Sequence, residues 1–178
     1  MCRYSSSNYK PHFACFSCRK TFKRRLNRDI KNGAEKEVSI AKCPECGKTM
    51  ADMGLDFESP KKANTKAWQH VQSLFQAGIT FHSCGCSGPG YIPKDRNELI
   101  GYLERRLNRF IEERRFWINR KEPESKKERE KEARVNSRTL YNIPNELITG
   151  TRKTKYFNTH KAIEYWTKRF ERIAWLIK

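Results

Sequence analysis

The sequence predicts an α+β protein, with short antiparallel strands near the amino terminus and mainly helices afterwards. Three observations predict it. Two Cys-x-x-Cys pairs stand early in the chain, Cys15 with Cys18 and Cys43 with Cys46. Apolar residues recur at helical spacing in much of the rest of the chain. Residues 120–138 are almost all charged or polar. We therefore expect a cysteine-clamped segment followed by a helical part that contains a long charged connector.

The two cysteine pairs have the spacing of a structural metal site. Two such pairs can surround one tetrahedral zinc ion, with each thiolate about 2.3 Å from the metal. Pro44 fixes the backbone entering the second pair, and Gly47 can adopt the left-handed turn that directs amide N–H groups at the sulfurs. The alternative is buried disulfides or free thiols. The chain has seven cysteines, and an odd number argues against a complete disulfide framework. We expect one structural Zn²⁺.

The net charge of +18 in 178 residues makes a polyanion the expected partner. Nucleic acid fits better than an anionic membrane surface, because arginine and aromatic residues are abundant. No run approaches the roughly 18 apolar residues that a membrane span needs. Residues 1–10 contain no apolar signal region. We expect a cytoplasmic protein with no membrane partner and no small-molecule substrate.

We divide the chain into five segments. They are a flexible basic tail (1–10), the cysteine-clamped segment (11–58), a helix–loop–long helix region (59–119), the charged connector (120–138) and a basic loop with an amphipathic helix (139–178). In the second segment, Val38 and Ile40 alternate as in a strand with one buried face. Such a segment has almost no core of its own, and the metal supplies much of its stability.

Three helices are predicted from their capping residues and apolar spacing. The first is capped by Thr65 and stopped by Gly78, after which Ile79 and Phe81 suggest a short strand. The second opens with the capping-box sequence of residues 95–98 and continues to about residue 119.

The third helix is capped by Asn158 and continues to about Ile177. Its apolar residues share one face. Three cations stand on the opposite face: Lys161, Lys168 and Arg172.

The charged connector allows two interpretations. It can form a solvated helix held by pairs such as Glu122–Lys126 and Glu130–Arg134, or it can be a mobile linker. Because it has no apolar stripe to bury, we favour the linker.

Two basic stretches are the candidate nucleic-acid contacts. The residues between the cysteine pairs form either a solvated loop tip or, as we favour, a finger that grips phosphates. Its cations are Lys20, Lys23, Arg24, Arg25 and Arg28. The second stretch is a loop in which Tyr156 and Phe157 can stack on bases beside cations. These cations are Arg152, Lys153 and Lys155.

We expect no enzymatic activity. Cys84 and Cys86, with His82, suggest redox chemistry or a metal contact, but a loop of small residues packing near the zinc segment is the interpretation we favour. Carboxylates that could hold a catalytic metal as in a nuclease more often cap solvated turns: Asp52, Asp56 and Glu58. No P-loop or G-x-G-x-x-G pattern is present.

The cysteine pairs resemble those of zinc-ribbon proteins of ribosomes and of transcription machinery, over about residues 11–50. The resemblance implies ligands at the four cysteines and nucleic-acid contacts at Lys20, Lys23, Arg24 and Arg25. With the charge, it predicts a non-enzymatic RNA-binding protein of the translation apparatus, which contacts rRNA phosphates and neighbouring ribosomal proteins. The alternative is a DNA-binding transcriptional or mobile-element protein, and a metal- or cysteine-dependent enzyme is a distant third.

Overall fold

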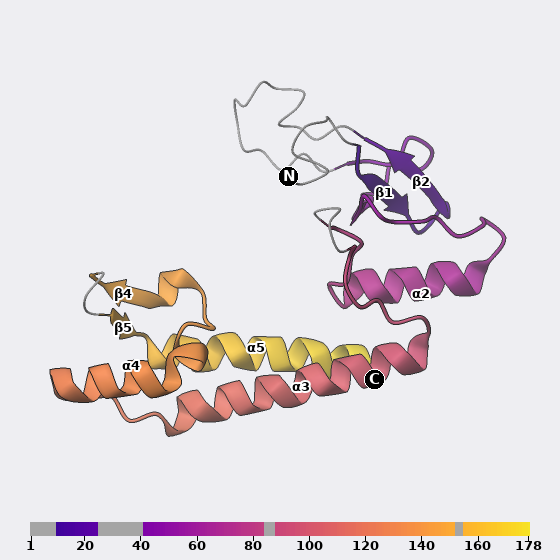
Figure 1. The fold of residues 1–178 in the computed structure, drawn as a ribbon. Helices are drawn as coiled ribbons and strands as arrows, with labels where there is room; N and C mark the ends of the chain where they lie inside the picture. Colours follow the sequence, from indigo (N-terminus) through magenta and orange to yellow (C-terminus); the bar gives the residue numbers. More distant parts are fainter. Residues whose placement is uncertain (1–9, 25–40, 84–87, 152–154) are drawn as a thin grey trace. The chain divides into compact units, whose positions relative to one another are not determined.

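The computed structural model describes residues 10–24, 41–83, 88–151 and 155–178, which form two compact units (Figure 1). The first unit is Met1–Leu99 and the second is Ile100–Lys178. Strands stand near the amino terminus and helices dominate afterwards, so the predicted α+β class is confirmed. No helix in the described ranges is both long and apolar enough to cross a membrane.

The first unit is built on a three-stranded antiparallel sheet in the order β2-β1-β3. Its strands are β1 (His12–Cys15), β2 (Lys20–Lys23) and β3 (Ala51–Gly54), and β3 had not been predicted. Cys15 ends β1, and Cys18 lies in the tight turn that connects β1 to β2. The predicted strand around Val38 and Ile40 lies outside the described residues.

Alternation along the chain gives this sheet two different faces. Ala14 and Phe16 pack with Met53 and Trp68 in an apolar core. Phe13 and Cys15 instead belong to a second cluster, with Cys18 and Cys43. Successive side chains of a strand point to opposite faces, so one short strand serves both the core and the cysteine cluster.

Helix α2 (Thr65–Gln76) supplies the other side of the first core. Its N-cap is Asn64, whose side chain accepts a hydrogen bond from the Ala67 amide, so the prediction of Thr65 as the cap was wrong by one residue. The predicted stop at Gly78 is confirmed: Gly78 has φ +76°, and the amides of Gly78 and Ile79 donate to carbonyls of the last turn.

The segment after α2 does not form the strand predicted at Ile79 and Phe81. Its link to β3 is made by the Phe81 amide, which donates to the Met53 carbonyl, and the Phe81 carbonyl, which accepts from the Asp56 amide. Gly54 makes this approach possible, since a Cβ there would lie 2.6 Å from backbone atoms of Phe81. Two isolated hydrogen bonds around a glycine do not make a ladder.

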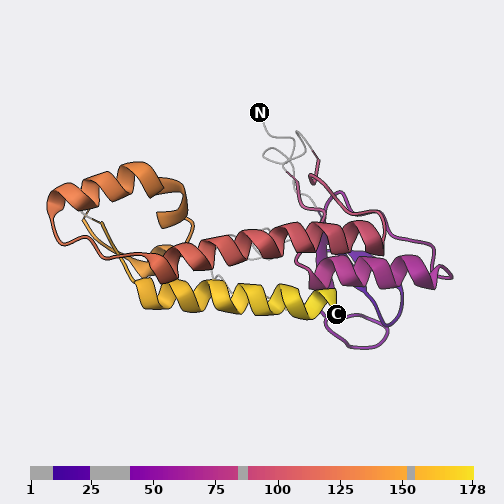
Figure 2. The ribbon, with the colours of Figure 1, turned by 90° about the horizontal axis from the view of Figure 1, so that it is seen from below.

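Helix α3 (Arg96–Asn119) begins and ends where the sequence predicts. Asp95 caps it by accepting from the Glu98 amide, but the Glu98 side chain accepts from the Lys94 amide rather than completing the capping box. In the second unit α3 lies beside α5 (Thr159–Ile177), as Figures 1 and 2 both show.

Helices α3 and α5 pack through their aromatic residues and one polar bridge. The rings of Phe110 and Trp166 lie 5.3 Å apart, and the Arg114 Nε donates to the Thr167 hydroxyl at 2.8 Å. Helix α5 is capped by Asn158, as predicted.

Most of the charged connector is helical, which corrects our preference for a linker. Helix α4 (Lys126–Leu140) opens with a complete capping box between Ser125 and Glu128, and Leu140 at its end is fully buried. Its backbone kinks at Asn136. A 3₁₀ turn (Asn145–Leu147) and a hairpin follow. The hairpin strands are β4 (Ile148–Gly150) and β5 (Lys155–Phe157), so the stretch predicted to be a basic loop includes a strand.

Candidate metal centre

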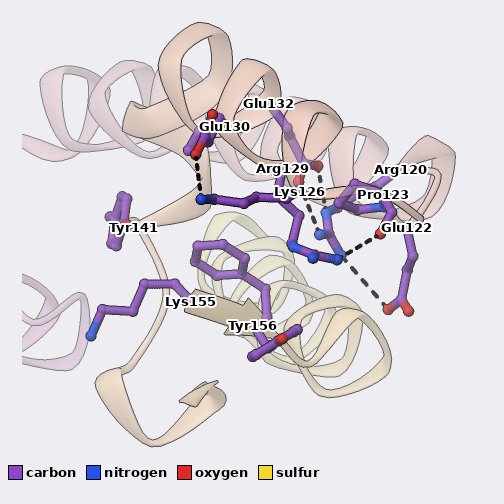
Figure 3. Close-up of a pocket in the computed structure, with 12 residues that line it drawn as sticks. Arg120, Glu122, Pro123, Lys126, Arg129, Glu130, Glu132, Tyr141, Lys155 and Tyr156 are labelled. Carbon is purple, nitrogen blue, oxygen red and sulfur yellow. Dashed lines mark hydrogen bonds and ion pairs between the residues drawn. The ribbon is translucent and has the colours of Figure 1, made fainter. Parts of the chain in front are cut away.

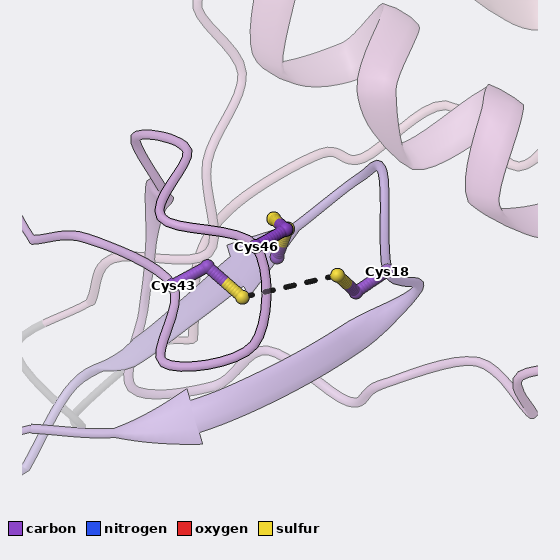
Figure 4. A group of neighbouring side chains, drawn as sticks. Cys18, Cys43 and Cys46 are labelled. Atoms are coloured by element: carbon purple, nitrogen blue, oxygen red, sulfur yellow. Dashed lines mark hydrogen bonds between the residues drawn. The ribbon is translucent and has the colours of Figure 1, made fainter.

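The four cysteines predicted as ligands come together in the first unit (Figure 4). Their Sγ atoms all lie within 4.8 Å of one another. Cys15 and Cys46 are 3.6 Å apart at sulfur, and Cys18 and Cys43 are 3.9 Å apart. Four sulfurs placed tetrahedrally about 2.3 Å from a zinc ion would be separated by about 3.8 Å. The arrangement can therefore hold one metal ion.

Each cysteine pair is followed by a residue whose backbone adopts the left-handed conformation, with positive φ. In the second pair this residue is Gly47, at φ +70°, as the sequence predicts. In the first it is Arg19, at φ +50°, the one positive φ outside glycine in the described ranges. The second turn is closed by hydrogen bonds from the Gly47 amide to the Cys43 carbonyl and from the Cys43 amide to the Lys48 carbonyl.

Backbone amides donate hydrogen bonds to the first sulfur of each pair, and these bonds act to lower the pKa of that thiol. Burial raises the pKa of Cys15, although the Cys18 amide donates to its sulfur. The side-chain hydrogen bond with Cys46 raises the pKa of Cys18 to about 12. Burial alone would raise the pKa of Cys43, but the Cys46 and Glu45 amides that donate to its sulfur lower it to about 7.

The cluster is closed on its inner side by apolar side chains. Cys15 and Cys43 are buried and pack with Met50, and half-buried Phe13 and Phe22 lie against them. Four thiols fill all the positions of a tetrahedral ion and leave none for a substrate, which is the pattern of structural rather than catalytic zinc sites. Without a metal, four adjacent sulfurs cannot all carry charge.

Polar contacts tie the first hairpin to the second cysteine turn. Lys20 forms an ion pair with Glu45, which raises the lysine pKa and lowers the carboxyl pKa. Arg24 Nη2 donates to the Lys42 carbonyl at 2.7 Å. Lys48 Nζ donates to the Ser17 hydroxyl at 3.1 Å. No local pattern predicts these pairings, since their members are far apart along the chain.

The predicted nucleic-acid contacts lie in both units. Near the cysteine cluster, Lys23 and Arg24 are exposed, whereas Lys20 is engaged by Glu45. On α5, the predicted row is exposed, but the Lys168 Nζ lies 2.6 Å from a Glu164 oxygen. The exposed members of that row are Lys161, Lys168 and Arg172. Four predicted contacts lie outside the described residues: Arg25, Arg28, Arg152 and Lys153.

The two aromatic residues predicted to stack on bases differ in their surroundings. Tyr156 is 52% exposed, beside exposed Lys155. Phe157 is instead packed inside the second unit, with its ring 5.5 Å from that of Tyr141 and 6.1 Å from that of Trp117. Only Tyr156 of these two offers an open face.

The other candidate chemistry is not assembled in the part of the chain that the structure describes. The four cysteines are the one group there that could hold a metal, so the carboxylate metal site that the sequence analysis disfavoured is not formed by the described residues. Asp52 instead contacts His82 and accepts from the Gly54 amide, and Asp56 accepts from Ser83. Cys84 and Cys86 lie outside the described residues.

Comparison of the chain with models of known protein families, with curated proteins and with solved structures finds no match. The description of the metal centre therefore depends on the cysteine geometry alone.

Proposed function

We propose that this protein is a zinc-stabilised, non-enzymatic RNA-binding protein that associates with the ribosome. The observation that carries the proposal is the cysteine cluster at the turn of the β1–β2 hairpin, whose second strand is basic. Four sulfurs at metal-binding distance join this hairpin to the second cysteine turn, and β2 ends at exposed Lys23, which exposed Arg24 follows. A metal ion there would make a short, core-poor hairpin rigid enough to present cations in a fixed arrangement.

The cations near the cluster suit phosphate binding. In the described ranges no ion pair neutralises Lys23 or Arg24, and the contact of Arg24 with the Lys42 carbonyl fixes its guanidinium without using its charge. Lys20 contributes less, because Glu45 already holds its ammonium group. Each phosphate that such cations neutralise releases counterions, which favours binding and makes it salt-dependent.

Structured RNA is favoured over duplex DNA by how the helices use their faces. A DNA reader presents a helix with a compact set of base-reading side chains. Here α2 buries Trp68 and Leu74, and α5 buries Trp166 and Ile173. Cations spread over hairpins and helix surfaces in both units suit a binder that contacts phosphates and reads RNA shape. The ribosome is proposed because the cysteine pairs resemble those of ribosomal zinc ribbons.

The salt dependence of binding to a structured rRNA fragment tests this proposal. We expect log K to fall linearly with log salt, with a slope of about −0.7 to −0.9 per phosphate neutralised. Replacing Lys23 and Arg24 with Gln should flatten the slope by roughly 1.5 if each contacts one phosphate. Lys61→Gln with Lys66→Gln, two exposed cations of the same unit, is the matched control.

A slope unchanged by the Lys23 and Arg24 substitutions would remove the hairpin from the interface. Sedimentation of the protein with ribosomal particles at low salt, and its release at high salt, would support the ribosomal assignment. A discrete footprint on duplex DNA, with weaker binding to RNA, would favour the DNA-binding alternative.

A further inference from the structure

The second unit contains a pocket of about 290 Å³ between α4 and β5. Figure 3 shows helix side chains on one side and those of the strand on the other. Its wall combines exposed aromatic rings with cations, and it is separate from the residues of the metal centre. We propose that this pocket binds one unpaired nucleotide, with the base on Tyr156 and the phosphate held by Arg129 and Lys155. The inference rests on the proposed RNA-binding function and names the element of RNA that is recognised.

The aromatic part of the pocket is unusually open. Tyr156 is 52% exposed and Tyr141 is 50% exposed, and the Tyr141 ring is held 5.5 Å from that of Phe157. The Arg129 guanidinium lies 5.7 Å from the centre of the Tyr156 ring, which supports the ring by a cation–π contact. Exposed rings that are held in place are suited to base stacking, because every base has a π face.

Two cations of the pocket have no ion-pair partner in the described part of the chain. The Arg129 Nε is buried and has no hydrogen-bond partner in the described part of the chain, and its Nη1 reaches the Pro123 carbonyl only at 3.5 Å. Lys155 is exposed on β5, and no ion pair within the described ranges involves it. Arg120, in contrast, is 5% exposed and is neutralised by Glu132. Lys126 also lines the pocket, but its ammonium group faces Glu130 at 3.9 Å. Within the described ranges, the lining cations without a carboxylate partner are therefore Arg129 and Lys155.

Two further features restrict the ligand. Glu122 and Glu130 also line the pocket, so a purely anionic ligand such as a polyphosphate would meet repulsion there. Carboxylates can instead accept hydrogen bonds from the amino group of a base. A neutral aromatic ligand would leave Arg129 and Lys155 without an anionic partner. The volume is at the lower end of ligand pockets, roughly 300–1,000 Å³, which suits a single nucleotide.

The base must be unpaired, because a base in a duplex is stacked on both faces and its Watson–Crick edge is occupied by its partner. This requirement supplies the test. The 178-residue chain is titrated with a 12-nucleotide single-stranded RNA, with the same strand paired to its complement, and with AMP. Each titration is repeated with Tyr156→Ala and Tyr156→Phe. Trp175→Ala, which removes a 69% exposed ring elsewhere in the second unit, is the matched control.

We expect Tyr156→Ala to weaken single-strand binding about tenfold, while duplex binding changes less than twofold. Tyr156→Phe and Trp175→Ala should retain single-strand affinity, because the first keeps the ring and the second lies outside the pocket. Lys155→Gln should weaken single-strand binding and flatten its salt slope by about 1. AMP that binds as tightly as the oligonucleotide, with the same dependence on Tyr156, would support the nucleotide pocket and assign it to free nucleotides.

The inference would be overturned if Tyr156→Ala weakened the affinities for single strand and duplex equally. It would also be overturned if Tyr156→Ala left the affinity for the single strand unchanged. Displacement of the oligonucleotide by a glutamate-rich peptide that needs the Tyr156 ring would also overturn it, in favour of a protein ligand. The proposed function can fail separately. It fails if the unmodified protein binds neither RNA, whereas binding of both RNAs without any effect of Tyr156 leaves RNA binding intact and removes only the pocket.

Discussion

Arg120 and Glu132 form a buried two-point ion pair in the second unit. Arg120 Nε lies 2.7 Å from Glu132 Oε1, and Nη2 lies 3.1 Å from Oε2. The arginine side chain is 5% exposed and the glutamate side chain 15%. The same guanidinium stacks over Trp117 and Phe157. The pair therefore joins α4, through one of its charged residues, to the aromatic cluster that α3 and β5 share.

Breaking this pair should destabilise the second unit strongly. Glu132→Ala leaves a buried arginine without its main partner, and we expect it to lower the free energy of unfolding by about 3 kcal/mol. The matched control is Glu130→Ala on the same helix, whose exposed pair with Lys126 spans 3.9 Å and should contribute less than about 0.5 kcal/mol. Denaturant unfolding followed by tryptophan fluorescence measures both changes. Equal effects of the two substitutions would contradict the importance assigned to the buried pair.

Removing the metal should unfold the first unit and leave the second folded. Structural zinc contributes on the order of 10–16 kcal/mol in small zinc modules, far more than the few strand residues of this sheet can replace. We expect one zinc per chain by elemental analysis, lost in Cys43→Ser and retained in Cys2→Ser. Amide NMR spectra recorded before and after chelation identify which unit collapses. A first unit that stays folded without metal would refute a structural role for the ion.

Zinc affinity should fall steeply as the pH is lowered. The raised pKa values of Cys15 and Cys18 mean that both thiols hold protons at pH 7 without metal, and zinc must displace them. Cys43, with a pKa of about 7, adds a third proton at lower pH. The logarithm of the affinity should therefore rise by at least about two per pH unit above pH 7, and by at least about three per pH unit below it. Competition with a chelator of known pH dependence measures the slope, and a flat profile would contradict it.

Two glycines should differ sharply in their tolerance of a side chain. Gly47→Ala places a Cβ in open space, so only the left-handed backbone is penalised, by about 1 kcal/mol. Gly54→Ala adds to that strain a Cβ 2.6 Å from backbone atoms of Phe81 and His82, and we expect a loss of roughly 3 kcal/mol or more. Urea unfolding with saturating zinc measures both. If both substitutions lowered the free energy of unfolding by similar amounts, the segment after α2 would be able to move away from Gly54 at little cost.

The locally encoded features of this protein were predictable. Each of the helices α2, α3 and α5 carries its own capping residue and apolar spacing, and those signals placed their ends within a residue or so. The cysteine spacing likewise predicted which four sulfurs would meet. The capping box of Ser125 and Glu128 was also present in the sequence and would have indicated the start of α4.

The sequence by itself determined the α+β class, three of the helices and the membership of the cysteine cluster, because periodicity, capping and Cys-x-x-Cys spacing act over a few residues. Only the tertiary structure decided that the charged connector docks as a helix, that Phe157 is internal while Tyr156 stays open, and that Lys20 is occupied by Glu45. These outcomes depend on partners distant in the chain. From the sequence alone, a charged residue such as Glu132 is expected to be solvated. In the fold it is instead largely buried, because it pairs with Arg120.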